Sequence, residues 1–281
     1  MGGLGNQLFQ VFCLLNYTFK HKKKFKIPFG KPDLVSPLDN TSKRPVYWDT
    51  ILSKLAPFLG DTAWVSVAYR EPGFQYNEIP MINNIANPIK LFGYFQSYKY
   101  FDENYELILR FLDFYNKMRE TRERYASNFF TSPDTVTVSL HFRIGDYKIR
   151  PDVHPVLTQS YYISAINQVI SKYADSTSIQ ILYFGEYQDD AIVEDNIDQL
   201  KALFSQIRFV KCDYTVPDWE QVLLMACCQH NIIANSSFSW WGAYLNHNAN
   251  KIVCYPSIWF GVACVQDTTD MFPDGWLKIR V

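Results

Sequence analysis

The sequence predicts an α/β protein whose C-terminal half is a parallel sheet with helical crossovers. From residue 135 onward, short β-branched runs alternate with segments of helical apolar period. The chain has 281 residues, 48% of them apolar, which is enough for two domains with sizeable cores. In the first 130 residues, by contrast, prolines interrupt the pattern, so only short elements and loops are expected there. We therefore expect a Rossmann-type sheet domain preceded by a smaller, loop-rich domain.

The smaller domain, residues 1–133, begins with a glycine-rich segment at 2–7, directly before a helical pattern at 8–19. Eight prolines follow between residues 28 and 88. A long amphipathic helix over about 102–130 should link the two domains. The polar, proline-containing break Thr131-Ser132-Pro133-Asp134 then ends the domain, because proline disfavours helix at the residue before it.

The sheet domain should cover residues 134–262, with residues 263–281 as a C-terminal tail that can cross back to the first domain. Its strands are expected at 135–142, 179–185, 207–212, 232–235 and 251–255. Helices are expected between them, at about 159–173, 189–204, 218–228 and 238–246.

Composition and spacing exclude several classes of protein. A formal net charge of −1 argues against a nucleic-acid partner. The longest uncharged apolar stretch, 222–228, is too short to span a bilayer, and the lysines near residues 8–19 follow that segment instead of preceding it. Neither the cysteines nor the five histidines have metal-ligand spacing. We expect a cytoplasmic protein without a metal site, although a membrane anchor outside this sequence stays an alternative.

Arg143 is the first candidate functional residue, in the segment HFRIGDY at 141–147. It emerges where the first strand of the sheet domain ends. Ligands of open α/β sheets bind outside the carboxyl ends of strands, so an arginine there is well placed to bind a phosphate. The structural alternative is that Arg143 pairs with Asp146 and only stabilises the turn.

Two helix starts and the glycine segment offer further candidates. Asp218 could be an N-cap or could accept two N–H bonds from the edge of guanine. Ser236, Ser237 and Ser239 open the next helix and could bind a diphosphate in place of a metal. The glycines at 2–5 allow close backbone approach to a phosphate or a sugar, or serve a tight turn.

Four segments together resemble the α-1,2-fucosyltransferases of glycosyltransferase family eleven. They are GGLGNQLFQ at 2–10, GYFQSYKYF at 93–101, SLHFRIGDY at 139–147 and HNIIANSSFSWWGAYLN at 230–246, followed by PSIWF at 256–260 and PDGW at 273–276. The resemblance implies a GT-B architecture and inverting, metal-independent transfer of L-fucose from GDP-β-L-fucose. It also implies the 2-OH of a terminal galactose as acceptor, and no cofactor beyond the donor substrate GDP-fucose.

The resemblance also implies roles for individual residues. It assigns Arg143 to the donor diphosphate, and His141 and Asp218 to the guanosine. Around the phosphates and base it places Ser236, Ser237 and Phe238, and facing the sugar and acceptor it places Gly3, Gly5, Asn6 and Gln7. Where most of the family has a second consecutive arginine, this chain has Ile144.

Inverting transfer needs a base for the acceptor hydroxyl and a stabiliser for the departing diphosphate. Arg143 and the helix start at Ser236 would stabilise the diphosphate. The base stays open between Asp146 and His154, which follow the same strand. Ile144 also leaves a catalytically impaired nucleotide-sugar or glycan-binding protein as an alternative. An NAD-dependent dehydrogenase is disfavoured, because no strand-to-helix turn carries G-x-G-x-x-G.

Overall fold

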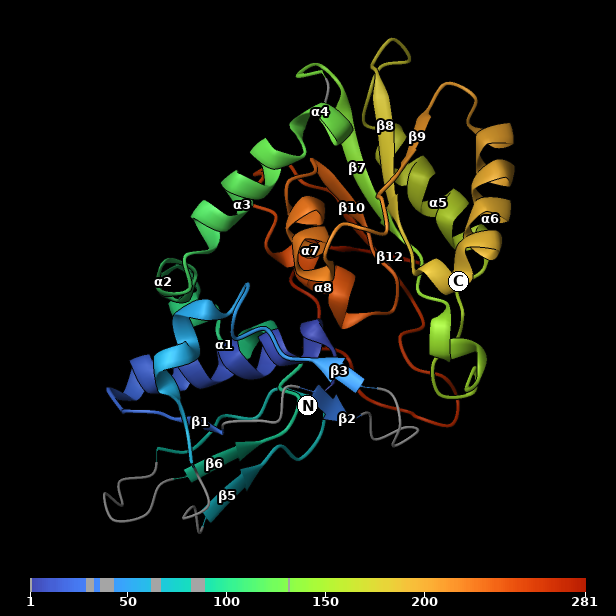
Figure 1. The fold of residues 1–281 in the computed structure, drawn as a ribbon. Coiled ribbons are helices and arrows are strands. Elements are labelled where there is room, and N and C mark those ends of the chain that lie inside the picture. Colours follow the sequence, from blue (N-terminus) through green and yellow to red (C-terminus); the bar gives the residue numbers. More distant parts are fainter. Residues whose placement is uncertain (1, 29–32, 36–42, 62–66, 82–88, 131) are drawn as a thin grey trace. The chain divides into compact units, whose positions relative to one another are not determined.

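The computed structural model describes residues 2–28, 33–35, 43–61, 67–81, 89–130 and 132–281 (Figure 1). By its internal packing the chain divides into two compact units. Unit 1 comprises Met1–Lys117 and Gln266–Pro273, and unit 2 comprises Met118–Val265 and Asp274–Val281. The division therefore falls before the break at 131–134 that we used as a domain boundary. Thr131 itself lies outside the described residues, as do Pro32, Pro37 and Pro88.

Unit 2 is built on a six-stranded, all-parallel sheet with the order β12-β11-β10-β7-β8-β9. The strands are β7 (Val136–His141), β8 (Ile179–Phe184), β9 (Arg208–Lys211), β10 (His230–Ile232), β11 (Val253–Pro256) and β12 (Leu277–Ile279). The first five match the strands predicted from the sequence, with β10 beginning and ending a few residues earlier. β12 was not predicted, because three residues of a polar tail carry too little pattern. The α/β fold class is confirmed.

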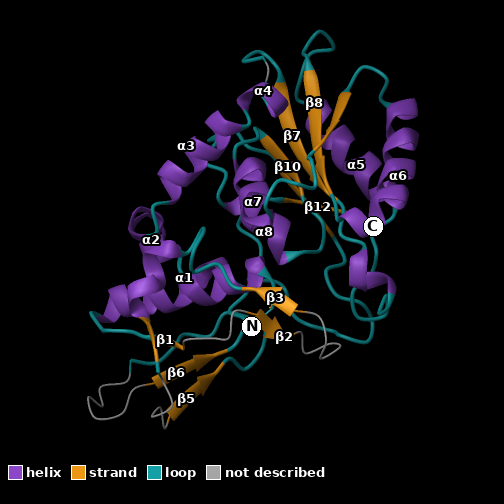
Figure 2. Ribbon diagram, viewed as in Figure 1, coloured by secondary structure: helices purple, strands orange, loops and turns teal. Residues whose placement is uncertain are grey.

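Helices cover both faces of this sheet (Figure 2). They are α4 (Ala126–Phe129), α5 (Gln159–Ile170), α6 (Asp190–Leu203), α7 (Asp218–Ala226) and α8 (Ser237–Tyr244). Successive side chains of β8 point to opposite faces: Ile181 and Tyr183 pack in the core with α5 and α6, and Leu182 and Phe184 pack in the core with α7. A strand buried on both faces is apolar over most of its length, which is why the sequence revealed β8 so clearly.

The single long helix expected over 102–130 is wrong. The segment forms η3 (Asp102–Asn104), α2 (Tyr105–Phe111), α3 (Phe114–Arg124) and α4. Asp113 separates α2 from α3 with a φ of 62°, a left-handed conformation that ends a helix. The Lys117 ammonium donates at 2.8 Å to the carbonyl of Leu112, the C-cap residue of α2.

Unit 1 is centred on the helix α1 (Leu4–His21), whose buried face packs against aromatic side chains. The ring of Phe12 meets those of Phe101 and Phe114 edge-on, with centroids 5.5 and 5.8 Å apart. Three two-stranded pairs are described: β1 (Ile27–Pro28) with β4 (Leu59–Gly60), β2 (Asp33–Val35) with β3 (Lys43–Pro45), and β5 (Val67–Arg70) with β6 (Ile89–Phe92). The 3-10 turns η1 (Ser53–Phe58) and η2 (Tyr98–Tyr100) complete the unit.

Residues 266–273 are held in unit 1 by hydrogen bonds and an ion pair of Asp270, and Asp267 accepts from Gln75. The Asp270 carboxylate accepts from the Tyr76 amide at 3.0 Å and pairs with Lys99, and the Asp270 carbonyl accepts from Ser97 at 2.6 Å. The chain then returns to unit 2 as β12, which pairs with β11. The last 16 residues are thus divided between the two units.

Candidate functional site

The strand order of unit 2 changes direction between β7 and β10. The chain runs outward from β7 to β8 and β9, then returns to β10 on the other side of β7 and continues to β11 and β12. In open α/β sheets such a switch point leaves a crevice at the carboxyl ends of the two strands, where ligands bind. His141 ends β7, and residues 233–236 connect β10 to α8.

His141 is buried at this switch point, with 6% of its surface exposed. Its Nδ1 lies 3.0 Å from the Ser239 hydroxyl of α8, and its ring lies 5.5 Å from that of Phe238. Burial, with a smaller contribution from the positive charge of Arg143, lowers the pKa of His141 to about 3. The imidazole is therefore neutral at physiological pH and acts here through packing and hydrogen bonds.

Arg143 follows two residues later, and its guanidinium is held from three sides. It forms ion pairs with Asp146 and Glu186 and lies over the ring of Tyr147, with Cζ 4.7 Å from the centroid. Only 13% of its side chain is exposed. Burial alone would lower its pKa, but the negative charge of Glu186, together with Tyr147 and Asp146, raises it instead. The predicted Arg143–Asp146 pair thus exists, within a larger cluster.

A buried carboxylate fixes the turn that follows Arg143. Asp189, 2% exposed, accepts from the Gly145 amide at 2.6 Å and from the Lys148 ammonium at 2.5 Å. It thereby ties the turn η4 (Gly145–Lys148), after β7, to the turn η5 (Tyr187–Asp189), after β8. A buried charge is stable only when it is paired and hydrogen-bonded, so Asp189 and Lys148 hold the Arg143 cluster in place.

His154 is part of an aromatic stack beside this cluster. Its ring is nearly parallel to that of Tyr147, with centroids 4.6 Å apart, and lies 5.8 Å from that of Phe260. The Tyr147 hydroxyl donates to the Asn235 carbonyl at 3.0 Å, which connects the stack to the start of α8. Burial lowers the pKa of His154, so the imidazole is neutral near pH 7.

The start of α8 lies at the same switch point. Ser236 is the N-cap, and its hydroxyl accepts from the Phe238 amide at 3.3 Å. The N-terminus of a helix favours negative charge, because its first amides have no partners within the helix. Contacts of His141 with Phe238, and of Tyr147 with the Asn235 carbonyl, bring the start of α8 close to Arg143 and His154. Asp146 pairs with the same arginine, and Ser236 and Ser237 open the helix.

Asp218 opens α7, and its carboxylate is exposed. The N-cap is Pro217, so the N-cap interpretation of Asp218 is wrong by one position: Asp218 is the first helical residue. Its carboxylate accepts from the Trp219 amide at 2.8 Å. A negative charge in the first turn stabilises a helix, and the exposed carboxylate can also reach a ligand.

In unit 1 the predicted glycine segment forms the start of α1. Gly3 is the N-cap, and Gly5, Asn6 and Gln7 lie inside the helix, which begins four residues earlier than expected. A Cβ on Gly3 would have no atom within 4 Å, so this glycine borders open space. The Asn6 carbonyl oxygen Oδ1 accepts from the Gln96 amide at 2.7 Å. The segment is uncharged, in contrast to the cluster in unit 2.

Gln7 is 5% exposed and donates through Nε2 to the carbonyls of Gly2 and Pro45, at 3.0 and 2.8 Å. Its Oε1 is buried without a protein partner. A buried acceptor without a donor is unfavourable, so this oxygen can take a hydrogen bond from a ligand hydroxyl or a water.

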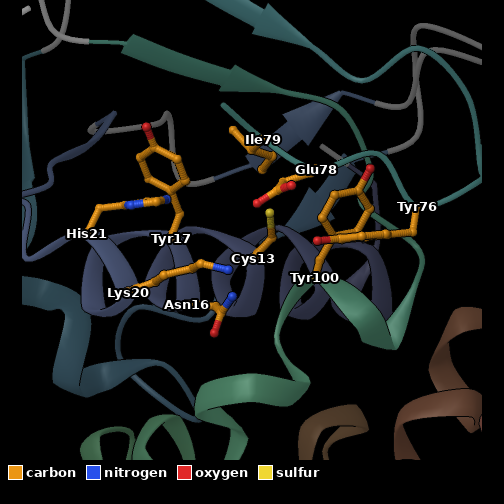
Figure 3. A pocket seen from close by; sticks show the side chains of 9 residues that line it. All are labelled: Cys13, Asn16, Tyr17, Lys20, His21, Tyr76, Glu78, Ile79 and Tyr100. Atoms are coloured by element: carbon orange, nitrogen blue, oxygen red, sulfur yellow. The ribbon is translucent and has the colours of Figure 1, made fainter. Parts of the chain in front are cut away.

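A separate hollow lies along α1 (Figure 3). It is lined by Cys13, Asn16, Tyr17, Lys20, His21, Tyr76, Glu78, Ile79 and Tyr100. Several of its polar groups are already used: Lys20 lies 3.0 Å from Glu103, Asn16 accepts from Asn104 at 2.8 Å, and Tyr17 donates to the Pro80 carbonyl at 3.2 Å. None of the predicted site residues lines this hollow, and we assign it no function.

Within the described ranges, no group of three or more His, Cys, Asp or Glu side chains could hold a metal ion. Nor is any helix of that part of the chain long and apolar enough to cross a membrane.

Comparison with known proteins identifies the family. The family model described as Glycosyl transferase family 11 matches residues 76–280, which is more than half of the chain. The chain belongs to glycosyl transferase family 11. The α-1,2-fucosyltransferase family predicted from the four motifs is therefore confirmed.

Two Escherichia coli proteins are similar to this family 11 chain. The O-antigen biosynthesis glycosyltransferase WbnK is 29% identical over 199 residues, which cover 69% of this chain and 62% of WbnK. An alpha-1,2-colitosyltransferase is 28% identical over 203 residues, which cover 70% of this chain and 64% of the relative. The alignments thus span less than two thirds of either relative.

A solved structure of a mutant Arabidopsis thaliana FUT1 in complex with GDP is similar in fold. It aligns with 99% of this chain and 74% of its own, with a TM-score of 0.51 and 11% sequence identity. This similarity confirms the GT-B-like α/β fold class.

Sequence reasoning missed Glu186, Asp189 and Tyr147. Glu186 directly follows a predicted strand and its glycine, so the rule that pointed to Arg143 could have found it. Asp189 and Tyr147 gave no such signal, because a carboxylate at a helix start and a tyrosine in a turn are usually structural. Ile144, which replaces the second arginine of the family, is 5% exposed and packs in the core with α5 and α6.

Proposed function

We propose that this family 11 chain transfers L-fucose from GDP-β-L-fucose to the 2-OH of a terminal galactose, with inversion and without a metal ion. The observation that carries the proposal is the position of Arg143 at the switch point, beside the start of α8. A guanidinium and a helix N-terminus that lie together at the carboxyl ends of the strands can both stabilise a diphosphate leaving group.

The donor would lie along the carboxyl edge of the unit 2 sheet. Arg143 and the α8 start would take the diphosphate, since stabilising charge on the leaving group is usually the largest contribution to such a reaction. His141, Phe238 and Asp218 would contact the guanosine: the buried neutral imidazole packs on Phe238, and the exposed carboxylate of Asp218 can accept from guanine.

Gly3, Gly5, Asn6 and Gln7 of unit 1 would contact the fucose and the acceptor. Their contacts are amide and backbone groups without charge, which suits the hydroxyls of a sugar. The buried, unpartnered Oε1 of Gln7 supports a ligand hydroxyl there.

The base that removes the proton of the acceptor hydroxyl would be Asp146 or His154. Asp146 forms an ion pair with Arg143, so its carboxylate already holds the arginine. His154 is neutral near pH 7 and can accept a proton, but its ring is stacked between Tyr147 and Phe260. The pH profiles of Asp146→Asn and His154→Asn will discriminate: the variant that lacks the base should lose the acid limb of kcat/KM.

The test is to incubate the protein with GDP-fucose and a panel of galactosides and to determine the new linkage by NMR. A colitosyl donor belongs in the same assay, because the name of one relative specifies α-1,2 transfer of a colitosyl group. Activity should persist in excess EDTA. Transfer to a position other than the galactose 2-OH, or loss of activity on chelation with recovery on adding Mg²⁺ or Mn²⁺, would contradict the proposal.

The second candidate is a catalytically impaired nucleotide-sugar or glycan-binding protein. Ile144 favours it, because this buried apolar side chain supplies no charge to a diphosphate. The two candidates differ in hydrolysis: slow release of free fucose from GDP-fucose, abolished by Arg143→Ala, is expected of the enzyme and not of the binding protein.

A further inference from the structure

Arg143 shares its guanidinium with two carboxylates from different turns. Asp146 lies three residues after Arg143, in η4, whereas Glu186 approaches from the turn after β8. Gly145 makes room for the second contact: a Cβ at this position, where φ is +23°, would lie 2.9 Å from both Arg143 Nη1 and Glu186 Oε2. The backbone of η4 is therefore shaped to let Glu186 reach the arginine.

The charges of this cluster do not suit a bound diphosphate as they stand. One positive and two negative side chains sum to −1, and the nearby Lys148 is occupied by the buried Asp189. A diphosphate that approaches Arg143 is repelled by both carboxylates, and close like charges in a partly buried site interact strongly. A diphosphate should therefore bind Arg143 more strongly when one carboxylate moves away.

Glu186 is the carboxylate that can move. Asp146 lies in η4, three residues after Arg143, and Asp189 fixes this turn through the Gly145 amide. The Glu186 side chain is longer, is 39% exposed, and is held on its other side only by the exposed Gln188 among the contacts described. Rotation of its side chain frees one edge of the guanidinium without any movement of the backbone.

We propose that Glu186 binds Arg143 at the position that the donor diphosphate takes. When Glu186 binds Arg143 again after transfer, it promotes release of GDP. The inference rests on the proposed function, because it takes Arg143 as the diphosphate ligand. In the free protein Glu186 keeps the guanidinium in the orientation that the donor needs, and after transfer it competes with the product for the same donors. Glu186 is thus a positioning residue that limits affinity for donor and product alike.

The test is GDP binding and release by Glu186→Gln, which keeps the size of the side chain and removes its charge. We expect GDP to bind about fivefold more tightly, with a correspondingly slower dissociation rate and a lower KM for the donor, as removal of one nearby negative charge implies. Asp195→Asn is the matched control: it removes one charge from an exposed residue of α6, and GDP affinity should be unchanged. In an Arg143→Ala background, Glu186→Gln should lose most of its effect.

The outcomes separate this inference from the proposed function. Unchanged or weaker GDP binding by Glu186→Gln, or an equal gain in the Arg143→Ala background, overturns the role of Glu186. Normal GDP binding without fucosyl transfer overturns the proposed function alone. Absence of GDP binding by the wild-type protein overturns both.

Discussion

The two units of this chain reach stability in different ways. The strand β8 of unit 2 is buried along its whole length, whereas β6 of unit 1 alternates between half-buried and exposed residues. Unit 1 relies instead on α1 and the aromatic rings that pack on it. A sheet covered on both faces needs nearly continuous apolar strands, whereas a helix with short strand pairs does not. Sequence patterns therefore predict the elements of unit 2 much better than those of unit 1.

The candidate residues of the two units also differ in charge. Unit 2 presents Arg143 among carboxylates, and unit 1 presents uncharged amides at the start of α1. We expect diphosphate binding to depend on unit 2 and sugar recognition to depend on unit 1. Arg143→Ala and Asn6→Ala test this difference directly, and progressively smaller effects are expected at His141, Asp218 and Asp113.

Arg143→Ala should lower fucosyl transfer at least about 100-fold, because a charge-assisted contact to the leaving group is lost. GDP affinity should fall as well, as measured by calorimetry. Asn6→Ala in unit 1 should also lower transfer but should leave GDP affinity unchanged, since GDP carries no fucose.

Arg150→Ala is the control, because Arg150 is exposed, pairs only with Asp152 among the ion pairs described, and lies in the same loop region. Loss of GDP binding by Asn6→Ala, or normal turnover by a folded Arg143→Ala, would contradict the assignment of diphosphate binding to unit 2 and sugar recognition to unit 1.

His141 should make unit 2 sensitive to acid. Its pKa is about 3 in the folded protein against 6.5 for an ordinary histidine, so between these values the unfolded chain binds a proton that the folded chain does not. Stability therefore falls as pH falls from 6.5 towards 3, by about 2 kcal/mol between pH 7 and pH 5. Urea unfolding of wild type and His141→Gln at both pH values measures this, and the variant should lose about 2 kcal/mol less. Equal losses in both proteins would mean that His141 is not buried as a neutral group.

Asp218→Asn should weaken GDP binding about tenfold and reduce discrimination against ADP, because an amide cannot accept from two donors of guanine. The melting temperature should change little, since Asp218 is an exposed first-turn residue whose contribution to the helix is small. A lower melting temperature with unchanged GDP affinity would assign Asp218 a structural role only.

Asp113→Gly should be more stable than Asp113→Ala by about 1 kcal/mol, because glycine adopts the left-handed φ of 62° without a Cβ penalty. Both variants lose the same side-chain contacts, so their difference in urea unfolding isolates the backbone. Equal stabilities would indicate that the break between α2 and α3 relaxes when the aspartate is removed.

Arg143 could be proposed from the sequence because a strong strand pattern ends beside it, and strand ends in a parallel sheet are where ligands bind. His141 ends the same strand, but only the family resemblance gave it a role. Glu186 and Asp189 could not be connected to them in the same way. They lie 43 and 46 residues after Arg143, and only the pairing of β7 with β8 brings the two turns together. The break at Asp113 was missed because neither glycine nor proline marks it.

The sequence by itself determined the family, the parallel sheet and the segment that carries Arg143, because these depend on local patterns and short motifs. The tertiary structure alone decided which charges surround that arginine, and that Ile144 faces the core while Lys148 neutralises Asp189. It also decided that residues 266–273 join unit 1 and that residues 277–279 complete the sheet of unit 2. The physical reason is that electrostatic pairing and strand addition act between residues far apart in the chain, and no local pattern records which of them will meet.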